Sequence, residues 1–525
     1  IVFSRLPLAD RVMSRLRPLA DNARNAPPWR ASEALGPAGS RFFVRASGQP
    51  LPDAAVPGLF TVEGLHRIVL PALPQAVREA VAESWVLGPQ AVSVAGAGDP
   101  VQLEVAVLTL YANEYAAAWD AVLNDLNIRP LSRAPAEAAE ALLLLGAPNS
   151  PIRDVLRSIA RQLSPGTNPD APAQGQGQPG QPAGGAQRQR DAAGGPEPSS
   201  AEPVARIIEQ RYQALRAVPG QPLDGALQIV NDLYAQVVRL VGATPGLALP
   251  PTPGLSPIQR LQAEAARQPD PFGRWLRILA VGSAGTTEAG SRQQIAAAGA
   301  AEVAPRCRPM EARFPIRRDG PEPPVDDFQR LFGPGGTLDQ FFSTRLRQFV
   351  DTTQTPWRPV APETQGGRPI VSPEDATQFW RASVIRDAFF PGVGAGGLRF
   401  ELVPQGFDAG AQGAILEAEG VRTEIGRGGP FRPISLSWPS RTNSTLTFDP
   451  PASVGPLAFD GPWSSLRLVM RRENTLVRVP NQPDRATVTI RAGDRFAQFQ
   501  LRAGSSNHPF GLRELEEFRC PQLAP

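Results

Sequence analysis

The side chains that most often carry out chemistry are few in this chain and stand apart from one another. Histidine occurs only at His66 and His508, and neither belongs to a nucleophile motif such as G-x-S-x-G. The two cysteines, Cys307 and Cys520, have no second cysteine or histidine at the spacing that a zinc site requires. We therefore predict no catalytic residue and no metal ligand, and we expect the chain not to be an enzyme.

Two glycine-rich stretches match nucleotide-binding loops by letter but not by context. Residues 392–397 fit G-x-G-x-x-G, yet they precede an expected strand, whereas a dinucleotide fingerprint must open a helix. Residues 333–337 read G-P-G-G-T and lack the lysine of a Walker A loop. We expect a turn at each place, with Thr337 as the N-cap of a following helix and Asp339 in its first turn. No cofactor is predicted.

The charge of the chain gives no indication of a nucleic-acid partner. All 53 basic residues are arginine, 50 residues are acidic, and the formal net charge is +3. The arginines are spread evenly, and no basic run is interleaved with aromatic residues, as a nucleic-acid surface would require. We therefore predict that the chain does not bind nucleic acid.

Residues 1–164 are expected to form a helical domain. Tyr111, Tyr115 and Trp119 recur at a spacing of four, which places them on one face of a helix. Such an aromatic stripe could line a ligand site, but packing in the core is its usual role, and we adopt that interpretation. Further amphipathic helices are expected over residues 61–87 and 151–163.

The composition changes from residue 165 to residue 203. Gly, Gln, Pro, Ala and Ser dominate there, and no aromatic residue occurs. Such a segment buries too little apolar surface to offset its conformational entropy, so we expect a flexible linker. Helical periodicity returns afterwards, and residues 204–392 are expected to form a second helical domain.

Residues 393–525 change from helical periodicity to the alternation of strands. Apolar and polar residues alternate over residues 398–402, 434–438, 446–448, 466–470 and 486–490. Gly493-Asp494 then marks a hairpin turn toward residues 497–501. About seven short strands at this spacing predict an antiparallel β-sandwich. The expected fold class is multidomain α+β, with an elongated all-α helical body followed by a C-terminal antiparallel β-sandwich.

No stretch of the sequence reaches the roughly 18 consecutive apolar residues that cross a bilayer. Ile1 does not begin a signal peptide, because no charged region followed by an apolar one stands there. A chain that starts at Ile without Met is expected to be a fragment of a longer protein.

Several motifs are similar to those of one known family. The chain contains Phe332-Gly333-Pro334, Gly461-Pro462-Trp463 and the terminal Phe518-Arg519-Cys520-Pro521. Leu6-Pro7-Leu8-Ala9, Trp85-Val86-Leu87-Gly88 and Arg313-Phe314-Pro315 add to them, so the similarity covers nearly the whole length. With these motifs the chain resembles the TssM (IcmF) family, the inner-membrane-anchored core of type VI secretion systems. It departs from the family pattern at His66, Arg427 and His508, and in its Gln/Gly/Pro-rich insertion.

The resemblance implies a scaffold in the periplasm. Its C-terminal β-sandwich would meet the outer-membrane lipoprotein TssJ, and the chain would assemble with inner-membrane TssL and further copies of itself. The membrane helices of such a protein would lie outside this fragment.

The resemblance also implies particular residues. Cys307 and Cys520 lie in motifs like the family's and would form a disulfide in the oxidising periplasm. Two buried free thiols are the alternative. Within the β-sandwich the loops are rich in Pro, Gly and Arg, and we name Arg427 and Arg432 as candidate partner-binding residues.

Two other functions remain open at this point. One is an envelope module that binds or processes glycans, which would need two carboxylates that meet in a cleft. Adjacent pairs such as Asp326-Asp327 and Glu516-Glu517 do not indicate one, since neighbours on a helix point in different directions. The other is an IcmF-like component of a type IV secretion system.

Overall fold

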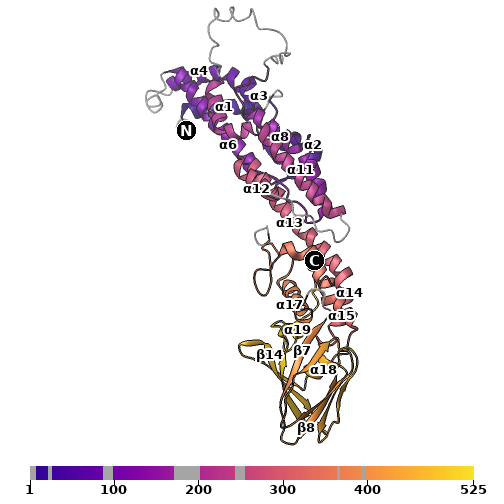
Figure 1. Cartoon of the computed structure of the whole chain (residues 1–525). Helices are drawn as coiled ribbons and strands as arrows, with labels where there is room; N and C mark the ends of the chain where they lie inside the picture. Colours follow the sequence, from indigo (N-terminus) through magenta and orange to yellow (C-terminus); the bar gives the residue numbers. More distant parts are fainter. Residues whose placement is uncertain are drawn as a thin grey trace, which may run out of the picture. The chain divides into compact units, whose positions relative to one another are not determined.

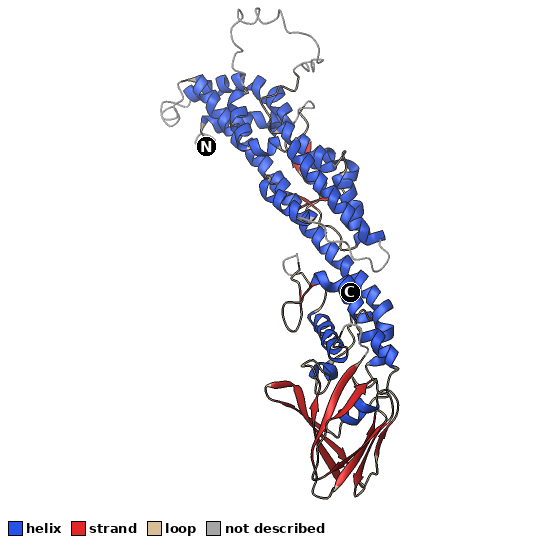
Figure 2. Ribbon diagram, viewed as in Figure 1, coloured by secondary structure: helices blue, strands red, loops and turns tan. Residues whose placement is uncertain are grey.

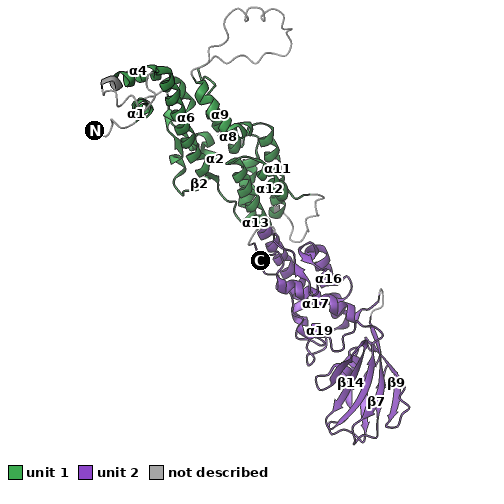
Figure 3. Ribbon diagram, turned by 90° about the vertical axis from the view of Figure 1, so that its left-hand side faces the viewer, with its two compact units in different colours: residues 1–242, 251–287 green, residues 243–250, 288–525 purple. Residues whose placement is uncertain are grey.

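The computed structural model describes residues 7–21, 26–86, 99–170, 201–242, 255–362, 367–392 and 397–525. In these ranges helices fill the chain up to residue 389, and antiparallel strands dominate after it (Figure 2). The fold class is therefore α+β. The chain separates into two compact units, residues 1–242 with 251–287 and residues 243–250 with 288–525 (Figure 3). The helical segment expected at 204–392 is thus shared between unit 1 and unit 2.

The described part of unit 1 is built from helices, with two pairs of very short strands between them, β1 with β3 and β2 with β4 (Figure 1). Its described elements are α1 (Leu8–Asp21), β1 (Trp29–Arg30), α2 (Ala31–Gly39), β2 (Phe43–Arg45), η2 (Leu51–Asp53), β3 (Ala55–Val56), η3 (Gly58–Phe60), α3 (Val62–Gly64), η4 (Leu65–Val69), α4 (Leu70–Val86), α6 (Pro100–Asp125), β4 (Leu126–Ile128), α7 (Pro135–Gly146), α8 (Pro151–Gln162), α9 (Glu202–Arg211), α10 (Gln213–Ala217), α11 (Gln221–Gly242), α12 (Pro257–Arg267) and the first part of α13 (Phe272–Ala298).

The aromatic stripe of α6 is core, as the sequence predicts. Tyr111, Tyr115 and Trp119 are fully buried. Their polar atoms donate to backbone carbonyls: the Tyr111 hydroxyl to Leu59, the Tyr115 hydroxyl to Gln162, and the Trp119 indole to Phe60. A buried donor without a partner would cost free energy, so these bonds allow the large rings to fill the core.

Residues 171–200 of the expected linker lie outside the described residues. The described ends of that segment contact unit 1. Arg67 forms an ion pair with Asp170 at 2.6 Å, and the amide of Gly166 donates to Glu209. Helix α9 begins at Glu202, just before the predicted boundary. The flexibility of the segment stays a prediction.

Unit 2 begins with helices and ends with a β head, the name used here for residues 398–525. Its helical elements before the β head are the last part of α13, η6 (Gly299–Val303), α14 (Ala304–Cys307), η7 (Arg308–Met310), α15 (Val325–Phe332), α16 (Thr337–Phe341), η8 (Phe342–Leu346), η9 (Arg347–Phe349) and α17 (Pro373–Phe389), with the short strands β5 (Val350–Asp351) and β6 (Arg358–Pro359) between them.

The β head is a sandwich of two antiparallel sheets. Its elements are β7 (Leu398–Phe407), β8 (Gly413–Ala418), β9 (Val421–Gly426), β10 (Ile434–Trp438), β11 (Ser444–Asp449), β12 (Leu457–Phe459), α18 (Ser464–Met470), β13 (Thr475–Val479), β14 (Gln482–Ala492), β15 (Arg495–Arg502) and α19 (Arg513–Glu517). The five-stranded sheet has the order β10-β7-β15-β14-β13, and the four-stranded sheet the order β12-β11-β8-β9. The hairpin predicted at Gly493-Asp494 joins β14 to β15.

One expected strand is wrong. Residues 466–470 alternate in the sequence, but they form helix α18. All residues of α18 except Arg467 are buried, so the segment is enclosed on both faces. The alternation of Leu466, Leu468 and Met470 therefore reflects no exposed face, and the period of two carries no information on the secondary structure.

An aromatic cluster joins the helices of unit 2 to the β head. Trp463 packs against Phe328 of α15 and Trp438 of β10, with ring centroids 5.4 and 4.9 Å apart. Trp438 also contacts Phe389 of α17 at 5.1 Å. The Trp463 indole donates to the carbonyl of Pro323. Both tryptophans are buried, and the β head shares this core with the preceding helices.

Candidate interaction surfaces of unit 2

The histidines are held by backbone contacts. His66 Nε2 lies 2.8 Å from the carbonyl oxygen of Pro165, and His508 Nε2 lies 2.9 Å from that of Pro483. His508 is buried, its Nδ1 has no hydrogen-bond partner, and burial lowers the pKa of its imidazole. Within the described ranges, no group of three or more His, Cys, Asp or Glu residues is placed to hold a metal ion.

The glycine-rich turn before α16 differs in detail from the expectation. Gly336, not Thr337, is the N-cap, and no side chain caps the helix. Asp339 instead accepts from the amide of Gly335 and forms an ion pair with Arg386 of α17 at 2.5 Å. Gly335 has φ +69°, a conformation that glycine adopts without strain. The turn therefore serves packing between α16 and α17.

Three of the four acidic side chains weighed for glycan chemistry are engaged in ion pairs. Glu516 pairs with Arg318, and Glu517 pairs with Arg381. Asp327 lies 3.5 Å from Arg330 on the surface of α15. These side chains point to separate basic partners, so they do not form two facing carboxylates of the kind that glycoside hydrolysis needs.

Cys307 and Cys520 are bonded to each other in the structure. Their Cα atoms are 5.8 Å apart, within the usual range for a disulfide. Cys307 ends α14 and is fully buried, and Cys520 follows α19 near the chain end. The bond joins positions that are 213 residues apart in the sequence.

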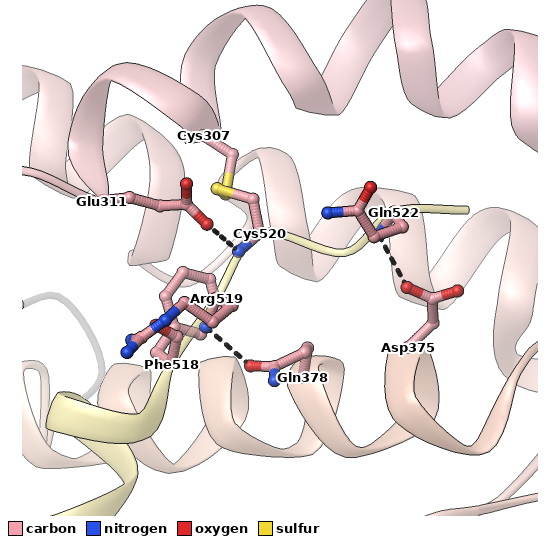
Figure 4. The surroundings of a disulfide bond; sticks show 8 residues. All are labelled: Cys307, Glu311, Asp375, Gln378, Phe518, Arg519, Cys520 and Gln522. Carbon is pink, nitrogen blue, oxygen red and sulfur yellow. Dashed lines mark hydrogen bonds between the residues drawn. A yellow bond between two sulfur atoms is a disulfide. The ribbon is translucent and has the colours of Figure 1, made fainter. Parts of the chain in front are cut away.

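The residues around Cys520 form an extended strap, which we define as residues 518–523, between α14 and α17 (Figure 4). Three of its backbone amides donate to side chains of the helical part of unit 2. Arg519 donates to Gln378 at 2.8 Å, Cys520 to Glu311 at 2.5 Å, and Gln522 to Asp375 at 2.7 Å. The strap is thus fixed by polar contacts as well as by the disulfide.

The apolar side chains of the strap enter the same core. Phe518 packs against Phe332 with centroids 5.1 Å apart, and Leu523 is 5% exposed. A Cβ on Gly299 would lie 2.5 Å from the Leu523 side chain. A side chain at Gly299 would therefore require Leu523 to shift from its place against η6.

The two candidate arginines of the β head have different surroundings. Arg427 is exposed, but its Nη1 donates to the carbonyls of Ala409 and Ala411 at 3.0 and 3.1 Å. It holds the β7–β8 loop in place, so a change there would disturb the loop as well as any partner. Arg432 is exposed in the loop before β10 and has no ion pair or side-chain hydrogen bond among the described residues. Arg432 is therefore the cleaner residue to test.

A polar network that sequence reasoning did not identify supports the same region. Glu419, at φ +53° in the β8–β9 turn, accepts from the amide and hydroxyl of Ser437 at 3.2 and 2.9 Å. Its second oxygen accepts from the backbone amide of Arg441. The hydroxyl of Ser465 in α18 lies 3.4 Å from the first oxygen, the one that contacts Ser437. The serines are visible in the sequence, but the carboxylate that accepts their hydrogen bonds lies in a different hairpin.

No helix that the structure describes combines the length and the apolar character that crossing a bilayer requires.

Comparison with known proteins identifies the family. Residues 2–164 match the IcmF-related family ("Intracellular multiplication and human macrophage-killing"), and residues 400–505 match the "Type VI secretion protein IcmF C2-like domain". The type VI secretion system component TssM1 of Pseudomonas aeruginosa is 31% identical over 548 aligned positions, which cover 99% of this chain and 48% of that protein. The chain therefore spans about half the length of this curated relative.

Two solved structures have a similar fold. A chain of a type VI secretion system membrane core complex aligns with a TM-score of 0.61 at 17% identity, over 98% of this chain and 97% of that chain. A chain of a type VI membrane complex aligns with a TM-score of 0.56 at 16% identity, over 98% and 93%. At these identities the solved structures support the fold only. The assignment to a family rests on the two family matches and on the relative from Pseudomonas aeruginosa. The chain belongs to the TssM (IcmF) family of type VI secretion proteins.

Proposed function

We propose that the chain is the periplasmic scaffold segment of a TssM-like component, and that it bridges the inner membrane to the outer-membrane lipoprotein TssJ. The observation that carries the proposal is the 31% identity to TssM1 along 99% of the chain. In this proposal the chain is a mechanical link between the inner membrane and the lipoprotein, and it catalyses no reaction. It assembles with inner-membrane TssL and with further copies of itself.

The periplasmic placement is supported by the disulfide. Disulfides persist in oxidising compartments, and the bacterial periplasm is one of them. In the described structure the Cys307–Cys520 bond lies in a buried region of unit 2 that also holds the chain end. A reducing compartment would leave both thiols free in that region.

The β head offers the surface for the lipoprotein. Strands β9 and β13 are edges of their sheets, and each pairs with one neighbour only. Val421 on β9 and Val477 on β13 are 60% and 58% exposed. Open strand edges and loops are surfaces that proteins commonly use for recognition. We place part of the contact at Arg432, whose guanidinium extends from an exposed loop.

The test uses the whole chain and its cognate TssJ. The β head alone is unsuitable, because its removal from α15 and α17 would expose the aromatic cluster around Trp438 and Trp463. The affinity of the two purified proteins is measured by titration calorimetry. A specific complex supports the proposal, whereas the absence of binding at micromolar concentrations overturns the bridging role.

A charge reversal tests the place of the contact. Arg432→Glu is expected to weaken TssJ binding at least about tenfold, because an interfacial guanidinium is replaced by a repelling carboxylate. The matched control is Arg472→Glu, since Arg472 is 78% exposed and makes one ion pair, with Asp319 at 3.4 Å. Equal affinities of the two variants would remove Arg432 from the interface.

The scaffold role has a separate test. The purified chain is expected to hydrolyse ATP no faster than a buffer blank, because its glycine-rich turn lacks a lysine. Turnover that scales with protein concentration and survives a second purification would contradict it.

A further inference from the structure

Both cysteines of the disulfide are closed off from solvent in the folded chain. Cys307 is 0% exposed and Cys520 is 6% exposed. A disulfide is made when a thiolate attacks a sulfur atom of another disulfide, so an external oxidant must reach the attacking thiol. With the strap in place, neither thiol of the reduced chain offers that contact. The bond therefore has to be made while the strap is detached from the helices of unit 2.

The strap is built to detach as one segment. Residues 518–523 belong to no helix or strand, and their backbone amides donate to side chains rather than to a neighbouring strand. Detachment breaks these bonds and uncovers Phe518 and Leu523, but it leaves every hydrogen bond within α14 and α17 intact. A segment with few partners opens at a lower free energy than a helix of the core, so the open form is a minor state of the folded chain.

Detachment affects the two cysteines differently. Cys520 leaves with the strap and becomes exposed along it. Cys307 stays at the end of α14, within the apolar core that also holds Val303 and Met310. The Glu311 carboxylate, which Figure 4 shows beside the bond, loses the Cys520 amide as its donor. That carboxylate then stands one turn after Cys307 without compensation and disfavours a thiolate there.

We infer that Cys520 is the cysteine that reacts with the oxidant, while the strap is detached, and that Cys307 closes the bond when the strap returns. The oxidant is a molecule with a reactive disulfide. The inference rests on the proposed periplasmic placement only for the presence of such an oxidant. The strap thus controls the reaction as well as holding its product.

The reaction has two exchange steps. The Cys520 thiolate attacks one sulfur of the oxidant, the S–S bond of the oxidant breaks, and its other sulfur leaves as a thiol. The Cys307 thiolate then attacks Sγ of Cys520 and expels the remaining sulfur of the oxidant. Two electrons pass from the cysteine pair to the oxidant, and the two thiol protons end on the two sulfur atoms of the reduced oxidant.

The first test measures how fast each thiol of the whole, reduced chain takes up glutathione. Cys307→Ala leaves Cys520 as the single thiol, Cys520→Ala leaves Cys307, and both keep the amide bonds of the strap. With oxidised glutathione as the probe, mass spectrometry follows the mixed disulfide. Cys520 should react at least about tenfold faster than Cys307 in buffer, and the two rates should agree within about threefold in urea, where no strap is docked. Equal rates in buffer, or an equally large difference in urea, would overturn the inference.

The parent chain gives a check without substitution. Reduced parent is mixed with oxidised glutathione, quenched with acid at early times and digested with pepsin. The transient glutathione adduct is expected on the peptide that contains Cys520. An adduct found mainly on the peptide with Cys307 would contradict the proposed order.

A further variant tests whether the strap limits the reaction. The side chain of Gln378 accepts from the Arg519 amide, and Gln378→Met removes this acceptor at similar volume. In the Cys307→Ala chain it should speed the reaction of Cys520 at least about threefold, because the strap detaches more often. The matched control is Gln329→Met on α15, since Gln329 is exposed and its side chain has no hydrogen bond among the described residues. Equal rates in these two variants would remove the strap from the control of oxidation.

These outcomes are separate from those of the proposed function. A chain that does not bind TssJ but reacts first at Cys520 would lose the bridging role and keep the order of oxidation. A chain that binds TssJ but reacts first at Cys307 would keep the bridging role, and the inference drawn from the strap alone would be overturned.

Discussion

The disulfide between Cys307 and Cys520 should determine much of the stability of unit 2. The perturbation is reduction of the parent protein, compared with a Cys307→Ala/Cys520→Ala variant that cannot form the bond. Reduction leaves every side chain in place, so the difference between oxidised and reduced protein reports on the bond itself. The variant should respond to neither oxidant nor reductant.

The expected magnitude follows from the length of chain that the bond closes. The two cysteines are 213 positions apart. The loss of entropy that such a cross-link imposes on the unfolded chain corresponds to about 5 kcal/mol at 25 °C. Residual structure in the unfolded chain reduces this value. The strap amides of Arg519, Cys520 and Gln522 keep their acceptors after reduction, so the strap should stay in place under native conditions.

The assay is urea unfolding, followed by hydrogen–deuterium exchange of peptides from β7 so that unit 2 is observed separately from unit 1. Oxidised protein should need more urea than reduced protein, with a difference in the free energy of unfolding of about 3 to 5 kcal/mol. A difference below about 1 kcal/mol would refute the loop-closure reasoning. Two reactive thiols in oxidised, denatured protein would refute the bond itself.

Three further predictions concern other parts of the chain. Burial holds the pKa of His508 below its ordinary value of 6.5, so the unfolded state binds a proton that the folded state excludes. The free energy of unfolding should therefore be constant above about pH 7 and fall as the pH drops below 6.5. The variant His508→Gln should show a smaller difference in the free energy of unfolding between pH 5 and pH 8, as measured by urea titration. Trp463→Ala should lower the free energy of unfolding by about 3 to 5 kcal/mol, because a buried ring and its hydrogen bond to Pro323 are lost. A decrease of less than about 1 kcal/mol in chemical denaturation would contradict the place of Trp463 in the shared core. Deletion of residues 174–196 should leave the melting temperature within about 2 °C, because a segment without apolar anchors adds little to stability; a large drop in calorimetry would show that it packs.

Local periodicity made part of the fold predictable. The stripe of Tyr111, Tyr115 and Trp119 belongs to one helix, so its spacing alone places it in the core. The hairpin at Gly493-Asp494 follows from turn chemistry between two adjacent strands. In both cases the residues that determine the outcome are neighbours in the sequence.

Contacts between distant segments were not predictable in the same way. Arg399 could be assigned to the outer face of its strand, since it alternates with Leu398 and Phe400. Arg399 lines an open groove together with Arg485 and Arg502, however, and these come from strands up to about 100 positions away, whose register depends on the whole sandwich. For the same reason the sequence showed Arg427 as a free surface charge, while the structure gives it two carbonyl acceptors from another loop.

The strap has a consequence for how the protein is made. Because Cys520 and Leu523 complete the packing of α14 and η6, the helices of unit 2 lack part of their core until the strap has been synthesised. Folding of this unit is therefore coupled to synthesis of residues 518–523, since the disulfide joins positions that are 213 residues apart. A polypeptide released before the strap would carry every strand of the β head yet leave Cys307 unpaired. Such a product would be a substrate for quality-control proteases, so the strap acts as a check on chains that were released before it was made.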